Sequence, residues 1–195
     1  MMTMEKIDAG ATVISPSKAW LRALELTAPI TRNRHRILPN VIEEVAARMG
    51  DAPALLSDRE RLTYRGLAAR SNQYARSALD RGLAKGDVAC LLMTNRPEYF
   101  SAWLGITSVG VVVSLLNTNL VGASLAHSIR IISPRHVIAS GEFAGTLAAV
   151  LPQLGLSPAI WMHGHQDTDF PRIDEDLERH SGEPLSRDER HAPRD

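Results

Sequence analysis

Residues 95–119, NRPEYFSAWLGITSVGVVVSLLNTN, decide the fold of this sequence. Pro97 opens a run that is uncharged from Tyr99 onward and has helical spacing, and Gly110 ends it. Residues 111–116 are an apolar, valine-rich run of the kind found in buried strands. The stretch closes on the polar triplet Asn117, Thr118 and Asn119. It predicts a buried helix leading into a buried strand, with hydrogen-bonding groups at the carboxyl end, where open α/β sheets bind ligands.

The composition bounds the size and the chemistry of the chain. Its 195 residues, 44% of them hydrophobic, suit one domain or one lobe with a real core. The 22 Lys and Arg residues balance the 22 Asp and Glu residues, so no net field attracts nucleic acid, and no nucleic-acid partner is expected. The single cysteine, Cys90, lies in the apolar run 88–93, so we expect a buried, unreactive thiol and a reducing, cytoplasmic setting.

Two segments bear on targeting. Residues 1–15 lack the apolar core of a secretory signal, and we expect them to be disordered. Residues 99–129 contain no charged side chain, which raises the alternative of a membrane span. Glycines and the polar triplet interrupt that window, and burial in an α/β core explains it better. We therefore expect a cytoplasmic protein, with peripheral attachment at the inner membrane face left as an open alternative.

The rest of the chain alternates predicted helices and strands. Helices are predicted to start at Pro16, at Pro39 and after Thr63, and residues 54–56 and 61–63 predict a β-hairpin. The predicted sheet strands are residues 88–93, 111–116, 136–139 and 159–162, and further helices are predicted over residues 120–132 and 142–151. This order predicts an α/β fold with a parallel sheet of βαβ units. We expect the lobe to span residues 16–165 and residues 166–195 to form a polar tail, exposed as a linker from residue 181.

Few patterns point to a chemical site. There is no G-x-x-x-x-G-K-[ST] loop, no G-x-G-x-x-G turn and no G-x-S-x-G elbow, so no catalytic residue is assigned. Gly141 and Gly145 open a predicted helix whose N-terminus is a weak candidate for an anion. Asn117 and Asn119 either bind a ligand or cap the next helix and satisfy turn backbone, the second being favoured.

Two clusters of basic or metal-ligating residues leave alternatives open. The first comprises His163 and His165 with Asp167 and Asp169, and forms either a metal site or a solvated loop. We expect the loop, and therefore no metal. The second comprises Arg32, Arg34, His35 and Arg36. It either contacts a phosphate or lipid headgroup or is a solvated connector, which is favoured.

Three strings, in order, resemble a known family. They are LTYRGLAARSNQYARSALDRGLAKGDVACLLMTNRPEYFSAWLGITSVGVVVSLLNTNL, LAHSI and HVIASGE. They resemble the N-terminal part of acyl-CoA synthetases of the adenylate-forming superfamily, and most of all the fatty acid transport protein, or very-long-chain acyl-CoA synthetase, branch. The similarity runs over residues 20–160, and NRPEY with NTNL is its most specific part. The sequence departs from the family pattern at Gly66, where Glu is usual, at Val121, where Arg is common, and at Ala123, where an acid is common.

The resemblance implies a larger enzyme that joins a fatty acid to AMP and passes the acyl group to coenzyme A. ATP, magnesium and coenzyme A are implied for that complete enzyme, whereas none is expected to bind this chain alone. The family's phosphate loop and C-terminal lid are expected beyond residue 195, so this chain is expected to be an inactive N-terminal fragment. Asn117, Thr118 and Asn119 are the expected wall residues of the acyl site. The alternative is a stand-alone binding module that associates with itself or with a complementary C-terminal chain.

Overall fold

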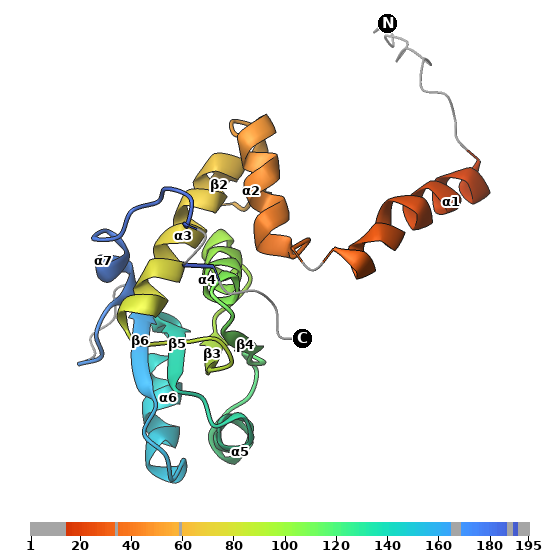
Figure 1. The fold of residues 1–195 in the computed structure, drawn as a ribbon. Coiled ribbons are helices and arrows are strands. Elements are labelled where there is room, and N and C mark those ends of the chain that lie inside the picture. Colours follow the sequence, from red (N-terminus) through yellow and green to blue (C-terminus); the bar gives the residue numbers. More distant parts are fainter. Residues whose placement is uncertain (1–14, 34, 59, 165–168, 187–188, 191–195) are drawn as a thin grey trace, which may run out of the picture. The chain divides into compact units, whose positions relative to one another are not determined.

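The computed structural model describes residues 15–33, 35–58, 60–164, 169–186 and 189–190 (Figure 1). Contacts divide the chain into two units, residues 1–36 and 37–195, and each is described by itself. The first contains the helix α1, Pro16–Thr27, and the 3-10 helix η1, Ala28–Arg32. The helix α1 starts at Pro16 as predicted, and Ser15 caps it, because its side chain accepts a hydrogen bond from the backbone N–H of Lys18 at 3.4 Å. The expected disorder of residues 1–15 falls, except for Ser15, outside the described residues.

The second unit begins with a helix, a hairpin and a longer helix. These are α2, Leu38–Met49; the antiparallel strands β1, Pro53–Leu56, and β2, Arg61–Thr63; and α3, Tyr64–Asp80. The hydroxyl of Thr63 accepts a hydrogen bond from the N–H of Gly66 at 3.1 Å and thereby caps α3. The predicted helix starts and hairpin are confirmed.

Four parallel strands form the sheet of this unit, in the order β4-β3-β5-β6. Their bounds are β3, Val88–Leu92; β4, Val112–Leu115; β5, His136–Ser140; and β6, Ala159–His163. The connections contain α4, Pro97–Ser108; α5, Gly122–Ile132; and α6, Ala144–Val150, with short 3-10 turns η2, Gly141–Phe143, and η3, Leu151–Gln153, beside α6. A last helix, α7, Ile173–Leu177, follows β6. The predicted α/β fold with parallel βαβ units is confirmed.

The two faces of the sheet carry separate cores. Ala89 and Leu91 of β3 pack into one core and Cys90 and Leu92 into the other, as the twofold periodicity of a strand requires. The first core contains residues of α3, α4 and α7, and the second contains residues of α5 and α6. Figure 1 shows α3 and α4 on one side of the sheet and α5 and α6 on the other.

The structure agrees with the expectation that Cys90 is buried and that the uncharged residues 99–129 do not span a membrane as one helix. Cys90 is fully buried, and burial raises the pKa of its thiol to about 12, so the thiol stays protonated and unreactive. Within the described ranges, no helix combines the length and apolarity needed to cross a bilayer.

Two expectations for residues 95–119 need correction. The strand β4 is not buried: it has a single neighbour in the sheet, and Val112 and Leu115 are 55% and 45% exposed. The predicted burial of the helix α4 holds for only part of its surface, because Phe100 is 38% exposed whereas Leu104 and Ile106 are buried. The buried residues also include the small Ser101, Ala102 and Gly105, because α4 packs closely against α3.

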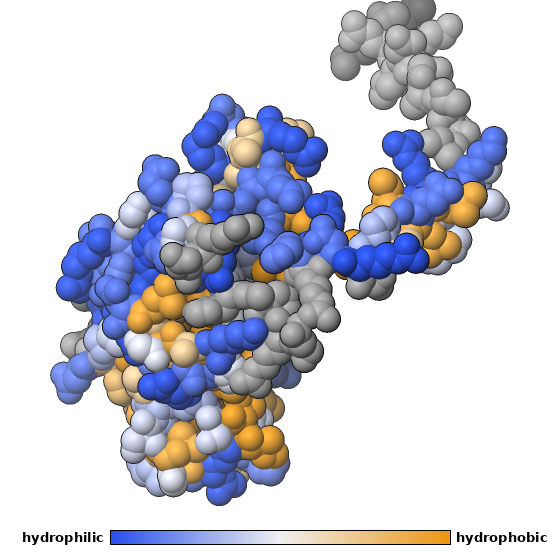
Figure 2. Space-filling model, viewed as in Figure 1, coloured by the Kyte–Doolittle hydropathy of each residue, from blue (hydrophilic) through white to orange (hydrophobic). Residues whose placement is uncertain are grey.

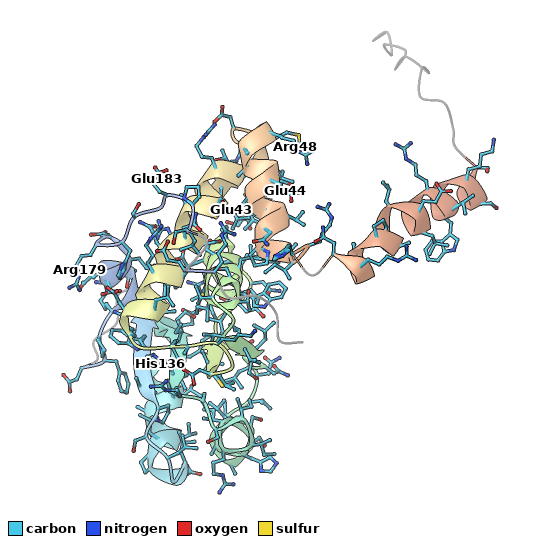
Figure 3. The ribbon with its side chains drawn as sticks, viewed as in Figure 1. Glu43, Glu44, Arg48, His136, Arg179 and Glu183 are labelled. Carbon is cyan, nitrogen blue, oxygen red and sulfur yellow. The ribbon has the colours of Figure 1, made fainter. Side chains whose placement is uncertain are left out.

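The segment after α7 differs from the exposed linker that the sequence predicts. Leu185 is 6% exposed and belongs to the core under α3. The guanidinium of Arg76 in α3 donates hydrogen bonds to the carbonyls of Ser181 and Glu183, both at 2.7 Å. Arg190 also pairs with Glu43 of α2 at 3.2 Å. Figure 3 labels Glu43 on α2 and Glu183 on the segment. These contacts hold a polar stretch that composition alone predicts to be solvated.

Candidate functional site

A polar cavity of about 670 Å³ opens where the parallel strands end. Thr94, Asn95 and Arg96 follow β3, Glu142 follows β5, and His163 is the last residue of β6. The turn between β1 and β2 adds Ser57, Asp58 and Glu60, and the start of α4 adds Pro97 and Glu98. The carboxyl edge of a parallel sheet is the usual place for a ligand site, so this cavity is the candidate functional site.

Glu98 is the buried centre of the site. It lies in the first turn of α4 and is 4% exposed. Its Oε1 lies 3.4 Å from Nε2 of His163 and 3.7 Å from a guanidinium nitrogen of Arg70 in α3. Burial alone would raise the pKa of Glu98, but His163, Tyr74 and Arg70 outweigh burial and hold the pKa below its ordinary value. The helix N-terminus favours the same charged form.

Three atoms around Glu98 retain hydrogen-bonding capacity. Among the described residues, the Tyr74 hydroxyl, Glu98 Oε1 and His163 Nδ1 are buried and have no hydrogen-bond partner of good geometry. Burial first, and then the charge of Glu98, raise the pKa of Tyr74 well above its ordinary value, so its hydroxyl keeps its proton. This cluster joins α3, α4 and β6 directly behind the cavity.

A second network ties the ends of β3 and β5 together at the mouth of the cavity. Arg96 pairs with Glu142 and donates a hydrogen bond to the Thr94 hydroxyl at 2.8 Å. That hydroxyl donates in turn to Glu142 Oε1 at 3.1 Å. Burial raises the pKa of Glu142, but hydrogen bonds and the charge of Arg96 outweigh it, so the pKa lies below its ordinary value. Glu142 is therefore ionised at neutral pH.

Among the described residues that line the cavity, negative charges outnumber positive ones. Four carboxylates, Asp58, Glu60, Glu98 and Glu142, accompany one arginine, Arg96, and one histidine, His163. Such a lining attracts cationic groups and repels a free polyphosphate. No group of three or more metal-ligating side chains able to hold an ion occurs among the described residues. Because His165 and Asp167 lie outside them, the choice between a metal cluster and a loop there is not tested. His163 itself contacts Glu98.

The triplet Asn117, Thr118 and Asn119 follows β4, at the outer edge of the sheet. The side-chain oxygen of Asn117 accepts a hydrogen bond from the backbone N–H of Asn119 at 2.9 Å. The backbone carbonyl of Asn117 accepts one from the N–H of Leu120 at 3.1 Å. This is the turn-forming role that the sequence left open, although α5 has no side-chain cap. The triplet is not among the described residues that line the cavity, and its contact with substrate remains a prediction.

Sequence reasoning missed Glu98 and its partners. Glu98 is the last charged residue before the uncharged window, directly after Pro97, which is a position where a carboxylate stabilises a helix start. The sequence also contains a second signal for this site: the polar residues Thr94 and Glu142 each come soon after a predicted strand. The sequence did single out His163, but for a metal site rather than for an ion pair with a helix start.

The fold matches the N-terminal subdomain of adenylate-forming CoA ligases. The sequence model of the family described as AMP-binding enzyme matches residues 42–192, and the chain belongs to this family.

Individual relatives agree with the family assignment. The human long-chain fatty acid transport protein 6 is 33% identical over 117 residues, which are 60% of this chain and 19% of that protein. A long-chain-fatty-acid–CoA ligase of Salmonella typhimurium is 31% identical over 147 residues, or 73% of this chain and 26% of that protein. A crystal structure of a proposed long-chain-fatty-acid CoA ligase from Rhodopseudomonas palustris superposes with a TM-score of 0.69 at 26% identity, covering 79% of this chain and 39% of that chain. The chain thus spans about a fifth to a quarter of the length of these curated relatives.

Proposed function

We propose that this chain is the N-terminal lobe of an ATP-dependent long-chain or very-long-chain fatty acyl-CoA synthetase. The reaction of the complete enzyme is the conversion of a fatty acid, ATP and coenzyme A to acyl-CoA, AMP and pyrophosphate. The observation that carries this proposal is the family match over residues 42–192, together with relatives whose names specify long-chain fatty acids. We also place the protein in the cytoplasm, attached peripherally at the inner face of the membrane.

By itself, the 195-residue chain is proposed to be inactive. Adenylation requires cations or hydrogen-bond donors around the phosphates of ATP. The described lining of the cavity, with its four carboxylates, does not fit a polyphosphate, and no step of the reaction is assigned to it. In this proposal, ATP, magnesium and coenzyme A are bound mainly by other parts of the complete enzyme, while Asn117, Thr118 and Asn119 form part of the wall of the acyl site.

A chimera tests the family function. Residues 42–192 would replace the matching segment of the Salmonella ligase, and acyl-CoA formation would be measured with palmitate, ATP and coenzyme A. We expect activity from the chimera and none from the 195-residue chain assayed alone. A chimera that folds, binds palmitate and still forms no acyl-AMP contradicts the proposed role of the lobe. Activity of the isolated chain contradicts the proposed inactivity.

A second candidate is a non-catalytic module that pairs with a complementary chain or with itself. The exposed Val112 and Leu115 on the outer strand β4 favour it, because an open apolar strand edge is a ready surface for association. The intact mass of the native product, isolated from its own cells, separates the two candidates. A mass several-fold above that of this chain supports the synthetase, and a mass equal to it supports the module.

A further inference from the structure

A smaller pocket of about 170 Å³ adjoins the polar cavity at the strand ends. The two spaces share four lining residues, which are Ser57, Asn95, Arg96 and Pro97. The rest of the smaller lining is apolar and consists of Leu55, Leu56 and Phe100, so we call this space the apolar pocket. On the face shown in Figure 2, hydrophobic residues lie among hydrophilic ones, so apolar exposure alone does not select a binding site. The apolar pocket is selected by its position beside the cavity.

Two carboxylates in the lining of the cavity have no countercharge among the described residues. Asp58 and Glu60 are exposed in the turn between β1 and β2, and neither forms an ion pair with another described residue. Glu142 differs, because Arg96 matches its charge. The two unmatched charges favour a positively charged ligand over a neutral or an anionic one.

Glu98 gives a second, independent indication of a ligand. It lines the cavity, is 4% exposed, and its Oε1 has no hydrogen-bond partner of good geometry among the described residues. The nitrogens of His163 and Arg70, at 3.4 Å and 3.7 Å, lie beyond the usual hydrogen-bond distance. A buried carboxylate oxygen without a donor costs free energy, and a ligand that donates a hydrogen bond removes that cost.

From these observations we propose that the cavity and the apolar pocket bind a small organic cation. A primary ammonium group lies in the cavity beside Glu98, and a short aliphatic chain fills the apolar pocket. An ammonium group supplies three donors as well as the positive charge. At roughly 30 Å³ per non-hydrogen atom, the apolar pocket has room for about six atoms of the chain.

Two other ligand classes fit the described lining less well. A carboxylate needs a free cation, but Arg96 already pairs with Glu142 and donates to the Thr94 hydroxyl. A metal ion needs several ligands around one point, and no such group of three side chains occurs among the described residues. The inference goes beyond the proposed ligase function and does not rest on it, because its test measures binding and not acyl-CoA formation.

Isothermal titration calorimetry of the full chain at pH 7 tests the proposal with four probes. Hexylamine, which is protonated at this pH as lysine is, is expected to bind. Methylamine lacks a chain for the apolar pocket and hexanol lacks the charge, so we expect at least tenfold weaker affinity for each. Hexanoate has the opposite charge and is expected not to bind.

Matched variants locate the ligand. Glu98→Gln is expected to weaken hexylamine binding at least tenfold, and Asp58→Asn/Glu60→Gln several-fold. Urea denaturation establishes that Glu98→Gln is folded, and the double variant, which lies on an exposed turn, tests the charge independently. Leu56→Ser should remove most of the advantage of hexylamine over methylamine. Asp51→Asn is the control, because this carboxylate is 92% exposed and is not among the lining residues.

Four results overturn the proposal. The first is hexanoate binding as tightly as hexylamine, and the second is equal affinity of wild type and either the folded Glu98→Gln chain or Asp58→Asn/Glu60→Gln. Displacement of hexylamine by an equal concentration of Mg²⁺ would assign the cavity to a metal ion. Tighter binding of N-acetyl-lysine amide than of hexylamine would assign it to a lysine side chain of a protein partner.

Discussion

At the scale of single residues, Asp176 shows how a partly buried ion pair contributes to the acid stability of the fold. Arg81 lies 2.6 Å from the Asp176 carboxylate, and His180 lies 3.1 Å from it. The hydrogen bond from Arg81 is the main reason that the pKa of Asp176 falls from 3.8 to about 2. The same guanidinium lies 3.7 Å from the centre of the Trp161 ring, so Arg81 connects α3, α7 and β6.

We predict that Asp176→Asn lowers the free energy of unfolding at pH 7 by about 2 kcal/mol, at roughly 1.4 kcal/mol per pKa unit. Because the pKa falls from 3.8 to about 2 on folding, this stabilisation is complete above about pH 5 and is lost as the pH falls toward 2. Urea titrations of both proteins at several pH values measure it, and their difference should shrink from pH 5 to pH 2. Asp51→Asn is the control, since the Asp51 carboxylate, paired with Arg65, is 92% exposed and should change little. A pH-independent difference would contradict the ion-pair explanation.

Ion pairs between residues far apart in the chain cannot be predicted from the sequence alone. The pairing of Glu98 with His163 depends on how α4 packs beside the end of β6. The sequence shows the two residues separately, and each has many acceptable partners until the strand order is known. Asn117 is the opposite case, because its turn contact is with Asn119, two residues away, and the sequence predicted that role.

At the scale of elements, the packing of α4 on α3 depends on Gly105. A Cβ atom at this position would lie 2.2 Å from the Ser71 carbonyl oxygen and 2.7 Å from Tyr74 Cβ, both on α3. The first contact is with backbone, which a side-chain rotation cannot relieve. Gly105 therefore fixes the distance between the two helices.

Gly105→Ala is predicted to lower the free energy of unfolding by about 3 kcal/mol, because the helices must separate and the core under them loses contacts. Gly145→Ala in α6 is the matched control: a Cβ there meets nothing within 4 Å, and alanine is the better helix former by up to about 1 kcal/mol. Urea denaturation of the two variants should give shifts of opposite sign. If Gly105→Ala left the free energy of unfolding unchanged, the two helices would be able to move apart without loss of stability.

Element type and order were predictable because the helical and strand periodicities are local. The burial of Ser101, Ala102 and Gly105 in α4 was not, because only the close contact with α3 selects small residues there. The burial of β4 was overestimated for a related reason. An apolar run predicts a strand, but only the pairing shows that β4 has one neighbour.

At the scale of the second unit, the strand order decides where the candidate site lies. The sequence correctly predicted that polar residues follow a strand, since Asn117 and Asn119 come after β4. It could not give the order β4-β3-β5-β6, which brings the ends of β3, β5 and β6 to one cavity and leaves the end of β4 at the margin. The sequence could therefore predict that a site lies at the carboxyl edge of the sheet, but not which residues form it.

The chain after α7 is held to this unit mainly by Arg76, whose side chain is 18% exposed. Besides the carbonyls of Ser181 and Glu183, the guanidinium reaches that of Pro184 at 3.2 Å and the carboxylate of Glu189 at 3.1 Å. These acceptors lie far along the chain from α3. Asn72 and Gln73 of the same helix add hydrogen bonds to the carbonyls of Gly182 and His180, both at 3.2 Å, but Arg76 supplies most of the donors. Removing the Arg76 guanidinium should loosen the segment without melting the sheet.

We predict that Arg76→Leu increases amide hydrogen exchange at least tenfold in residues 181–186 and leaves exchange in β3 and β5 within a few-fold of wild type. The physical reason is that the variant removes the donors to three carbonyls and one carboxylate while it keeps an apolar stem against α3. Arg179→Leu serves as the control, since Arg179 is 75% exposed and makes one ion pair at 3.5 Å. Exchange measured by mass spectrometry separates local from global opening. Unchanged protection of residues 181–186 in Arg76→Leu would contradict the role of Arg76. It would show that the burial of Leu185 and the hydrogen bond from Asn72 to the Gly182 carbonyl are enough to hold the segment.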